Sequence, residues 1–329
     1  MAGSKLGKGK LVILMPVYND WTAVGLLLPL LEKALTAHQM KAEILIVDDG
    51  STDPIPSILR QATFTAFESI DVLPLRRNLG HQRAIAIGLC FIEANRSCDA
   101  VIVMDCDGED DPDDVPRLVH ECVANGGQKI IFAARRRRSE NLAFKLFYHF
   151  YRLAHFLLTG VKVRVGNFSI VPEASLRRLV VVSELWNHYA AAVHKAKLPL
   201  AILPTRRGKR LYGSSRMNLV ALVVHGLSAM AVFGDRIGVR LLLLVCLGMV
   251  FAGSALLAVI GVRFFTHLAI PGWATYAVGL LLVMLMQMLV VVLVFAFVIL
   301  ASRDTASIIP ARDYASLTNE KMRLFGDGH

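Results

Sequence analysis

Two long stretches without a charged residue lie in the last third of the sequence and restrict what the chain can fold into. Leu241–Val262 is 22 residues long, and a second stretch runs from Leu268 to Ser302, with Pro271 near its start. A helix of about 20 apolar residues crosses the hydrocarbon core of a bilayer. The rest of the chain is too small to surround two such helices as a soluble core. The pattern therefore predicts two membrane-spanning helices.

Composition and charge agree with a chain that is anchored in a membrane. The 329 residues include 55% hydrophobic residues, the formal net charge is +10 and the mean hydropathy is +0.52. Such a positive charge suits nucleic acid, an anionic membrane surface or a phosphate-bearing small molecule. The apolar stretches favour the last two partners and count against nucleic acid. The five cysteines form no CxxC pair, and their odd number favours reduced thiols in a reducing compartment.

The distribution of basic residues predicts the orientation in the membrane. The N-terminal sequence MAGSKLGKGK leads directly into a strand-like segment and contains no signal peptide. Arg263 is the only lysine or arginine between the two apolar stretches, whereas the segments before and after them are basic. By the positive-inside rule, the soluble part and the C-terminal tail are both expected on the cytoplasmic side.

The segment before the apolar stretches alternates strand-like and helical patterns. Short apolar runs predict strands at Leu11–Val17, Ala42–Val47, Ser69–Leu75, Ala100–Met104 and Lys129–Ala133. Amphipathic stretches between them predict helices at Trp21–Ala37, Ile55–Gln61, Gly80–Ala94 and Val115–Ala124. This alternation is typical of an α/β fold with a doubly wound, mostly parallel sheet and helices on both faces.

These patterns divide the chain into four parts. We expect a soluble domain over residues 1–211, a juxtamembrane helix over 212–238, a two-helix transmembrane region over 239–302 and a cytoplasmic tail over 303–329. Asn141–Leu158 fits an amphipathic helix on the membrane surface or an ordinary half-buried helix, and Met217–Phe233, which is less polar, is a second candidate for an interfacial helix.

Polar clusters follow four of the predicted strands. They are PVYND from Pro16, DDGSTD from Asp48, RRNLGH from Arg76 and DCDGEDD from Asp105. Ligands bind outside the carboxyl ends of the strands in an open parallel sheet. Carboxylates two residues apart, such as Asp105 and Asp107, can hold one hard divalent cation and leave room for phosphate oxygens. The sequence has no GxxxxGK[ST] and no GxGxxG after the first strand, which excludes P-loop and dinucleotide-binding proteins.

In their order along the chain, MPVYND, VDDGSTD, RNLGHQRAIAIGL and MDCDGEDDP resemble the successive motifs of family 2 glycosyltransferases. The resemblance is to the branch of dolichol- and polyprenyl-phosphate sugar synthases, of the bacterial type with two C-terminal membrane helices. It continues through AARRRRSE, KLFYHFYRL, GNFSIVP and RRGKRLYGSSRMN. It implies a GT-A-like domain that transfers one sugar, with inversion, from a nucleotide-sugar to a polyprenyl phosphate. UDP is the favoured nucleotide and GDP the next, and the site is expected at the cytoplasmic face of a bacterial inner membrane. A soluble domain cut before Leu241 is then expected to bind nucleotide but to transfer poorly to a long-chain lipid.

The resemblance also implies roles for individual residues. Nucleotide-sugar contacts would come from Pro16, Tyr18, Asp20, Asp48, Asp49, Arg77, Asn78, His81 and Asp105. Ligands for Mg²⁺ or Mn²⁺ would be Asp105, Asp107 and Glu109, where Glu109 stands in place of a frequent Gln. The acceptor phosphate would meet Arg135, Arg210 and Arg216, where Arg216 replaces a usual Lys. The catalytic set would be Asp105, Asp107, Arg210 and Arg216.

Two departures from the family pattern bear on the acceptor. Asn167 stands where relatives commonly have Asp, and the QxxRW motif of processive members is absent. An alcohol acceptor would need a base to remove its proton, whereas a phosphomonoester is already ionised at neutral pH. The Asn therefore favours a lipid-phosphate acceptor, and the missing motif favours transfer of a single sugar.

Three other functions remain compatible with the sequence. A glycosyltransferase acting on a lipid-linked sugar hydroxyl would depend on a carboxylate base, for which Glu184 is a remote candidate. A nucleotidyltransferase would release pyrophosphate, and a membrane scaffold would bind no nucleotide-sugar. The sequence does not identify the sugar. Gly248, Gly253 and Ser254 in the first apolar stretch would allow close packing in a homo-oligomer.

Overall fold

The computed structural model describes residues 10–135, 155–161, 165–206, 208–213, 219–266, 272–304 and 308–326. The chain divides into two compact units, which are described separately. The first unit, called the head below, comprises Met1–Asn141, Val163–Val232 and Ser307–His329. The second comprises Leu142–Lys162 and Phe233–Ala306 and is called the helical unit.

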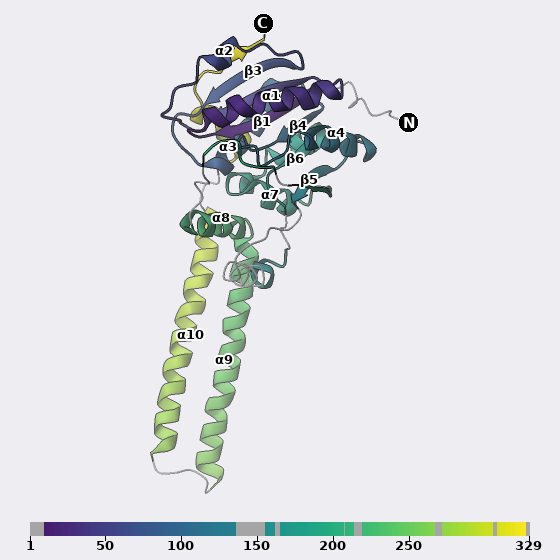
Figure 1. The fold of residues 1–329 in the computed structure, drawn as a ribbon. Coiled ribbons are helices and arrows are strands. Elements are labelled where there is room, and N and C mark those ends of the chain that lie inside the picture. The colour runs from purple at the N-terminus through teal and green to yellow at the C-terminus, as the bar shows by residue number, and fades with distance from the viewer. Residues whose placement is uncertain are drawn as a thin grey trace. The chain divides into compact units, whose positions relative to one another are not determined.

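The described residues of the head form an eight-stranded sheet in the order β7-β5-β6-β4-β1-β2-β3-β8 (Figure 1). The strands are β1 (Leu11–Val17), β2 (Ala42–Asp48), β3 (Phe67–Pro74), β4 (Ala100–Val103), β5 (Ile130–Arg135), β6 (Ser169–Pro172), β7 (Leu200–Thr205) and β8 (Met322–Phe325). β1 pairs in parallel with β2 and β4, β2 pairs in parallel with β3, and β5 pairs in parallel with β7. The pairs that involve β6 and β8 are antiparallel. The predicted mostly parallel α/β sheet is confirmed.

Helices cover both faces of this sheet. α1 (Trp21–Ala37) and α4 (Asp114–Ala124) contribute their apolar sides to one core. α3 (His81–Asn95), α6 (Glu173–Leu179) and α7 (Tyr189–Lys195) contribute to the core on the opposite face. All seven residues of β1 are buried, as expected for a central strand covered on both faces. Short helical turns lie at α2 (Ile58–Gln61) and at Ser183–Trp186.

The chain after the second apolar stretch belongs to the head. It forms α11 (Pro310–Asp313), a 3₁₀ turn (Tyr314–Leu317) and then β8, the outermost strand beside β3. Leu324 is buried in the core that contains α1, and Tyr314 packs against the core that contains α3. The sequence-based division set residues 303–329 apart as a tail. The described part of that tail instead completes the sheet, through pairing that no local pattern could reveal.

The helical unit contains the two apolar stretches as α9 (Gly234–Phe265) and α10 (Trp273–Asp304), each 32 residues long. Their mean hydropathies reach 2.6 and 3.0, so both are long and apolar enough to cross a membrane. A Cβ atom added at Gly248 of α9 would lie 3.1 Å from Cε of Met288 in α10, so the helices pack closely at this point. Residues 155–159 are helical. The remainder of the predicted interfacial stretch, residues 141–154, lies outside the described residues.

The second predicted interfacial stretch, Met217–Phe233, contains α8 (Leu219–Ala231). The helix itself is therefore confirmed over the part that the structure describes. Its position at a membrane surface stays a prediction.

Candidate functional site

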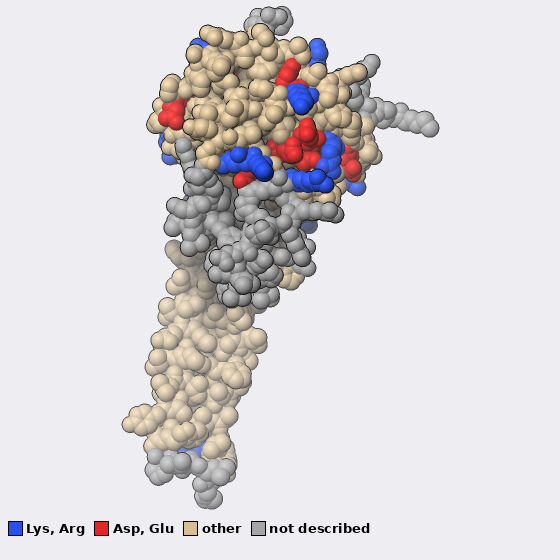
Figure 2. All heavy atoms as spheres, viewed as in Figure 1, with Lys and Arg blue, Asp and Glu red and all other residues tan. Residues whose placement is uncertain are grey.

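The polar clusters do lie along one edge of the sheet, where β4, β1, β2 and β3 are neighbours. Val17 at the end of β1 is in register with Asp48 at the end of β2, and Asp48 is in register with Pro74 at the end of β3. On the face of the head seen in Figure 2, acidic side chains form a patch bordered by lysine and arginine side chains. Asp20, Asp48, Asp105 and Asp107 lie at or just after the ends of these strands, so the edge predicted for ligand binding is rich in carboxylates.

The turns after β1 and β2 are fastened to each other by Asn19. This residue has φ of 51°, which asparagine tolerates better than most side chains. Its Oδ1 atom accepts hydrogen bonds from the backbone amides of Thr52 and Asp53, at 2.8 and 3.1 Å. The backbone amide of Asn19 donates to Oγ of Ser51 at 2.9 Å. These bonds fix the edge that presents Tyr18 and Asp20, a role of Asn19 that the motif alone did not reveal.

Asp49 holds the turn between β3 and α3. Its Oδ1 accepts from the amide of Leu79 at 2.7 Å, and its Oδ2 accepts from the amide of Gly80 at 2.9 Å. The side chain is only 3% exposed, and burial raises its pKa although the two amides act in the opposite direction. Both oxygens are therefore used inside the protein. Asp49 orients the turn that carries Arg77 and Asn78, while the half-buried Asp48 remains closer to solvent.

The acidic turn after β4 brings several predicted residues together. The amide of Asp105 donates to the buried Asp110 at 2.9 Å, and Oδ1 of Asp107 accepts from the amide of Glu109 at 2.9 Å. His81, the first residue of α3, places Nε2 3.1 Å from Oδ1 of Asp105. A side chain from α3 thus meets the carboxylates that follow β4.

Arg210 bridges the carboxylates of Asp107, after β4, and Asp20, after β1. Its Nη1 donates to Oδ2 of Asp107 at 2.8 Å and its Nη2 donates to Oδ2 of Asp20 at 2.7 Å. Its Nε donates to the carbonyl of Tyr212 at 3.0 Å, which fixes the guanidinium plane. The sequence predicted Arg210 as a contact for the acceptor phosphate. The structure places it on the acidic turn, so that contact stays a prediction.

Two glycines let the segment with Arg210 lie directly on the acidic turn. The amide of Gly208 donates to the carbonyl of Glu109, and the amide of Leu211 donates to the carbonyl of Asp107, both at 2.9 Å. A Cβ atom at Gly208 would lie 2.2 Å from the carbonyl oxygen of Gly108. Any side chain there would push the segment away, so this close approach requires glycine.

The electrostatics of this turn favour a cation. Burial raises the pKa of Asp107, and the neighbouring Asp105 and Glu109 raise it further, whereas Arg210 lowers it. Desolvation lowers the pKa of His81, but the carboxylates of Asp105, Asp110 and Asp49 together outweigh it and leave the pKa above its ordinary value. Closely spaced carboxylates favour a bound positive charge.

The donor chemistry of the turn fits a hard divalent cation. Asp105, Asp107 and Glu109 offer oxygen ligands, which Mg²⁺ and Mn²⁺ prefer. In the described part of the chain, no three His, Cys, Asp or Glu side chains are already gathered in metal-ligand geometry. Oδ2 of Asp107 faces Arg210 instead. The metal assignment of these residues therefore stays a prediction.

Asn167 lies at this site and is oriented by a chain of amides. The backbone amide of Tyr189 donates to Oε1 of Gln82 at 2.8 Å, so Nε2 of Gln82 is left to donate to Oδ1 of Asn167 at 3.0 Å. Nδ2 of Asn167 then lies 3.0 Å from Nε2 of His81. Because a backbone N–H can only donate, it sets the direction of both amides. Gln82 was not singled out from the sequence, although it follows His81 directly.

The remaining predicted residues are less closely involved. Arg77 and Asn78 are exposed in the turn before α3. Arg135 ends β5, and its side chain, like all of Arg216, lies outside the described residues. Glu184 pairs with Lys195 at 3.6 Å and is not among the side chains that meet at the acidic turn.

The sequence matches glycosyl transferase family 2 over residues 12–181, which is more than half of the chain. This match spans the turns after β1, β2, β3 and β4 that form the site. The chain belongs to glycosyltransferase family 2 and is a glycosyltransferase. The predicted family and enzyme class are confirmed.

Curated relatives include the uncharacterized glycosyltransferase YkcC of Bacillus subtilis, 23% identical over 272 residues that cover 81% of each chain. An undecaprenyl-phosphate 4-deoxy-4-formamido-L-arabinose transferase of Edwardsiella ictaluri is 26% identical over 220 residues, 64% of each chain. The enzyme of the same name from Yersinia pestis is 32% identical over 133 residues, covering 40% of this chain and 39% of the enzyme. The match spans less than two thirds of these named transferases.

Solved structures with a similar fold include two synthases. Mannosyl-3-phosphoglycerate synthase from Rubrobacter xylanophilus has a TM-score of 0.47 and 16% identity, covering 72% of this chain and 78% of that one. Glucosyl-3-phosphoglycerate synthase from Mycobacterium tuberculosis, in complex with Mn²⁺, UDP and glucosyl-3-phosphoglycerate, has a TM-score of 0.47 and 17% identity, covering 70% and 80%. Both are remote in sequence.

Proposed function

We propose that this glycosyltransferase moves a single sugar from a nucleotide-sugar to a polyprenyl phosphate at the cytoplasmic face of a bacterial inner membrane. The observation that carries the proposal is a family 2 head with an acidic turn in the same chain as two helices of membrane-spanning length. The name of the relatives from Edwardsiella and Yersinia, which includes undecaprenyl phosphate, supports the acceptor class.

The donor would bind along the edge formed by the turns after β1, β2 and β3. Pro16, Tyr18, Asp20 and Asp48 would contact the base and ribose of UDP, or of GDP as the alternative. Arg77 and Asn78 extend from the turn that Asp49 holds, and they would meet the diphosphate. Two backbone bonds to one buried carboxylate keep this turn in place before the donor arrives, which lowers the ordering cost of binding.

Asp105, Asp107 and Glu109 would hold Mg²⁺ or Mn²⁺, which would stabilise the negative charge of the departing nucleoside diphosphate. Arg210 supplies a further positive charge at the same place, since its guanidinium lies between Asp20 and Asp107. The acceptor oxygen would attack the anomeric carbon from the face opposite the leaving group, which inverts the configuration. Preorganised charges of this kind are a large part of catalysis by such sites.

The position of Asn167 supports a phosphate acceptor over an alcohol. Its amide lies against His81 and Gln82 beside the acidic turn, at 3.0 Å from each. An amide cannot take a proton from an alcohol, whereas a phosphate monoester with a second pKa of about 6 has already lost its proton at neutral pH. Positive charge to dock the phosphate is then needed more than a base. Arg135, Arg210 and Arg216 are the residues that we expect to provide it.

The test is a direct comparison of acceptors with the full chain in lipid. Enzyme, Mn²⁺ and radiolabelled UDP-sugars or GDP-sugars are incubated with polyprenyl phosphate or with polyprenol of equal length, and the lipid product is measured. We expect an acid-labile product from the phosphate and none from the alcohol. Asn167→Ala should change the rate far less than Arg210→Ala. Efficient transfer to polyprenol alone would overturn the acceptor, and release of pyrophosphate would identify a nucleotidyltransferase.

A further inference from the structure

The C-terminal segment, residues 310–326, is attached to the outer edge of β3 between Ile70 and Leu75. β8 pairs with β3 in antiparallel register, with Arg323 opposite Asp71 and Met322 opposite Val72. Thr318 also forms an isolated antiparallel bridge with Leu75, the residue that follows β3. The pairing gives β3 a second hydrogen-bonded neighbour, so β3 does not end the sheet.

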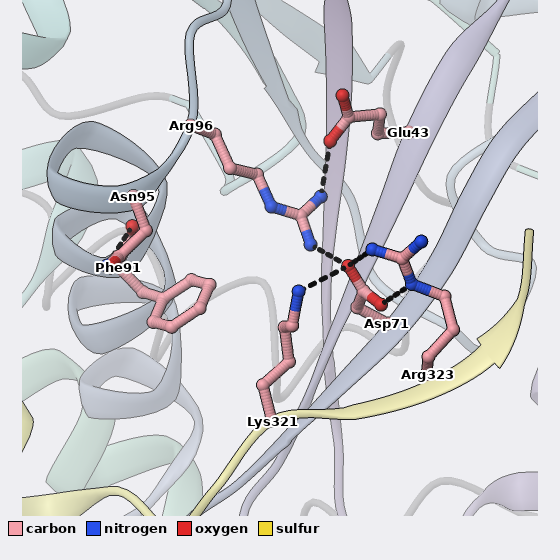
Figure 3. A network of polar contacts seen from close by, with 7 residues as sticks. All are labelled: Glu43, Asp71, Phe91, Asn95, Arg96, Lys321 and Arg323. Carbon is pink, nitrogen blue, oxygen red and sulfur yellow. Dashed lines mark hydrogen bonds and ion pairs between the residues drawn. The ribbon is translucent and has the colours of Figure 1, made fainter. Parts of the chain in front are cut away.

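A buried ion cluster fixes the register of this pairing (Figure 3). Asp71 is 0% exposed and lies 2.5 Å from Nη2 of Arg96, 2.6 Å from Nε of Arg323 and 3.4 Å from Nζ of Lys321. Arg96 also pairs with Glu43 at 2.9 Å. Two of the three cations around this buried carboxylate thus come from the C-terminal segment. A shift of β8 by one residue would carry the Arg323 side chain to the other face of the strand.

The same segment holds the start of the turn that presents Arg77 and Asn78. The amide of Arg76 donates to the carbonyl of Leu317 at 3.0 Å, and Nε of Arg76 donates to the carbonyl of Thr318 at 3.1 Å. The amide of Asn319 donates to the carbonyl of Pro74 at 2.9 Å. These bonds end one residue before Arg77.

The other end of this turn is held by Asp49 through the amides of Leu79 and Gly80. Gly50 adds a steric limit, because a Cβ atom there would lie 2.7 Å from the amide nitrogen of Asn78. The residues from Arg76 to Gly80, called the donor turn below, are therefore clamped at both ends. One clamp is Asp49, the residue after β2. The other is the C-terminal segment, where Thr318 contacts Arg76 from 242 residues further along the chain.

We propose that the C-terminal segment is a positioning element of the donor site, which sets the place of Arg77 and Asn78 without touching the substrate itself. The part of this proposal that concerns donor binding rests on the proposed function; the clamping of the turn does not. It changes one expectation from the sequence. A head cut before Leu241 would lose β8 and one of the two clamps, so its nucleotide binding should be impaired together with its anchoring.

The test uses the full chain in lipid nanodiscs and the variant Arg323→Met, which removes one cation from Asp71 and keeps the side-chain volume. We expect the Kd for UDP in Mn²⁺ to rise roughly tenfold, because a turn that is correctly placed a tenth of the time binds with a tenth of the affinity. Turnover at saturating donor should change less than about twofold, since the reacting groups are untouched. Amide hydrogen exchange at Arg76, Leu79 and Gly80 should become faster.

Three further variants separate positioning from general damage. Arg312→Met removes an exposed arginine of the same segment, which pairs with Asp313, and should change none of these readouts. Lys321→Met removes the longer contact to Asp71 and should raise the Kd for UDP and the exchange rates by less than Arg323→Met. It replaces Arg323→Met in the test if that variant does not fold. Asp71→Leu with Arg323→Met also leaves Arg96 and Lys321 without their carboxylate, so it should weaken protection and UDP binding at least as much as Arg323→Met alone.

Unchanged UDP affinity and unchanged exchange in the donor turn, in a variant that is measurably less stable, would overturn the proposal. An equal effect of Arg312→Met would overturn it as well. If the wild-type chain binds neither UDP nor GDP, the proposed donor has failed, and exchange alone decides. Faster exchange of the donor turn in Arg323→Met would then still establish the clamp, and unchanged exchange would refute it.

Discussion

The head contains two clusters of carboxylates and cations. Around Asp71, one buried carboxylate lies among three cations, and one of these also pairs with Glu43. At the acidic turn after β4, Arg210 bridges Asp107 and Asp20, and Nε2 of His81 lies 3.1 Å from Oδ1 of Asp105. Both clusters join segments that are far apart in the sequence.

The two clusters differ in where they lie. Asp71 is fully buried among three cations, and two of these belong to the C-terminal segment, so this cluster holds β8 to β3. The acidic turn lies at the edge of the sheet where ligands bind, and burial together with neighbouring carboxylates raises the pKa of Asp107. Crowded carboxylates with a raised pKa at such an edge are typical of a functional site, and we propose that this one binds a cation.

The largest expected effect is on catalysis by the acidic turn. Asp107→Asn keeps the shape of the side chain but removes a charge that we assign to metal binding. Turnover should fall on the order of 10²-fold or more, as when one electrostatic contributor is lost from an active site. The measurement is initial rate of lipid product in saturating Mn²⁺, together with the thermal unfolding midpoint, which should not fall.

Asp113→Asn is the matched control, since Asp113 is an exposed acid at the start of α4. It should retain most of the activity. Near-normal turnover of Asp107→Asn would contradict the metal assignment. The acidic turn would then, like the Asp71 cluster, have a structural role only.

The second effect is on stability and belongs to the other cluster. Asp71→Asn leaves Arg96, Lys321 and Arg323 together without their shared carboxylate. Removing one partner of a buried ion pair typically costs about 3–5 kcal/mol of folding free energy. Chemical unfolding of the head should show a loss of this size, whereas the same substitution at Asp107 should show none.

The control for this prediction is Glu173→Gln, which breaks a pair with Arg177 on the surface of α6. Both side chains are about half exposed or more, and such pairs contribute roughly 0.5 kcal/mol or less. Equal losses from Asp71→Asn and Glu173→Gln would show that the buried cluster does not hold β8.

The two clusters also differ in how far the sequence predicted them. The acidic turn follows a continuous apolar run, and β1 and α1 match the predicted bounds to the residue because their apolar pattern is local and strong. The carboxylates at such strand ends could therefore be placed on one edge of the sheet. The contact of Arg210 with Asp20 could not be predicted, since it joins residues 190 positions apart.

Asp71 gave no signal in the sequence for the same reason. It interrupts an apolar run in β3, and its partner Arg323 lies 252 residues away in a four-residue strand whose first two residues are exposed. A short edge strand has little periodicity to detect. β6 and β7 were missed similarly, because one has four residues and the other is half exposed and contains Pro204. Non-local pairing, not local preference, creates these elements.

A smaller effect should distinguish the arginines of the two clusters. Arg210 is 21% exposed and lies on carboxylates that we expect to bind a cation, so it competes with that cation in the absence of donor. Arg210→Ala should tighten Mn²⁺ binding without nucleotide by up to about fivefold, the range for a partly exposed ion pair. Mn²⁺ binding can be followed by electron paramagnetic resonance. Arg96→Ala, in the Asp71 cluster, should leave it unchanged, and weaker Mn²⁺ binding in Arg210→Ala would contradict the competition.

The smallest effect is the pH dependence of stability at the acidic turn. Burial raises the pKa of Asp107 above its ordinary value of 3.8, with Asp105 and Glu109 adding to the rise. Between pH 3.8, where the carboxyl of the unfolded chain titrates, and the raised pKa, the folded protein keeps a proton that the unfolded chain has released. The free energy of unfolding therefore falls as pH rises through this window. Asp107→Asn has no such proton. In EDTA, its stability relative to wild type should therefore grow as pH rises from about 4 and then level off. The opposite trend would mean that the positive charge of Arg210 outweighs burial and holds the pKa of Asp107 below its ordinary value.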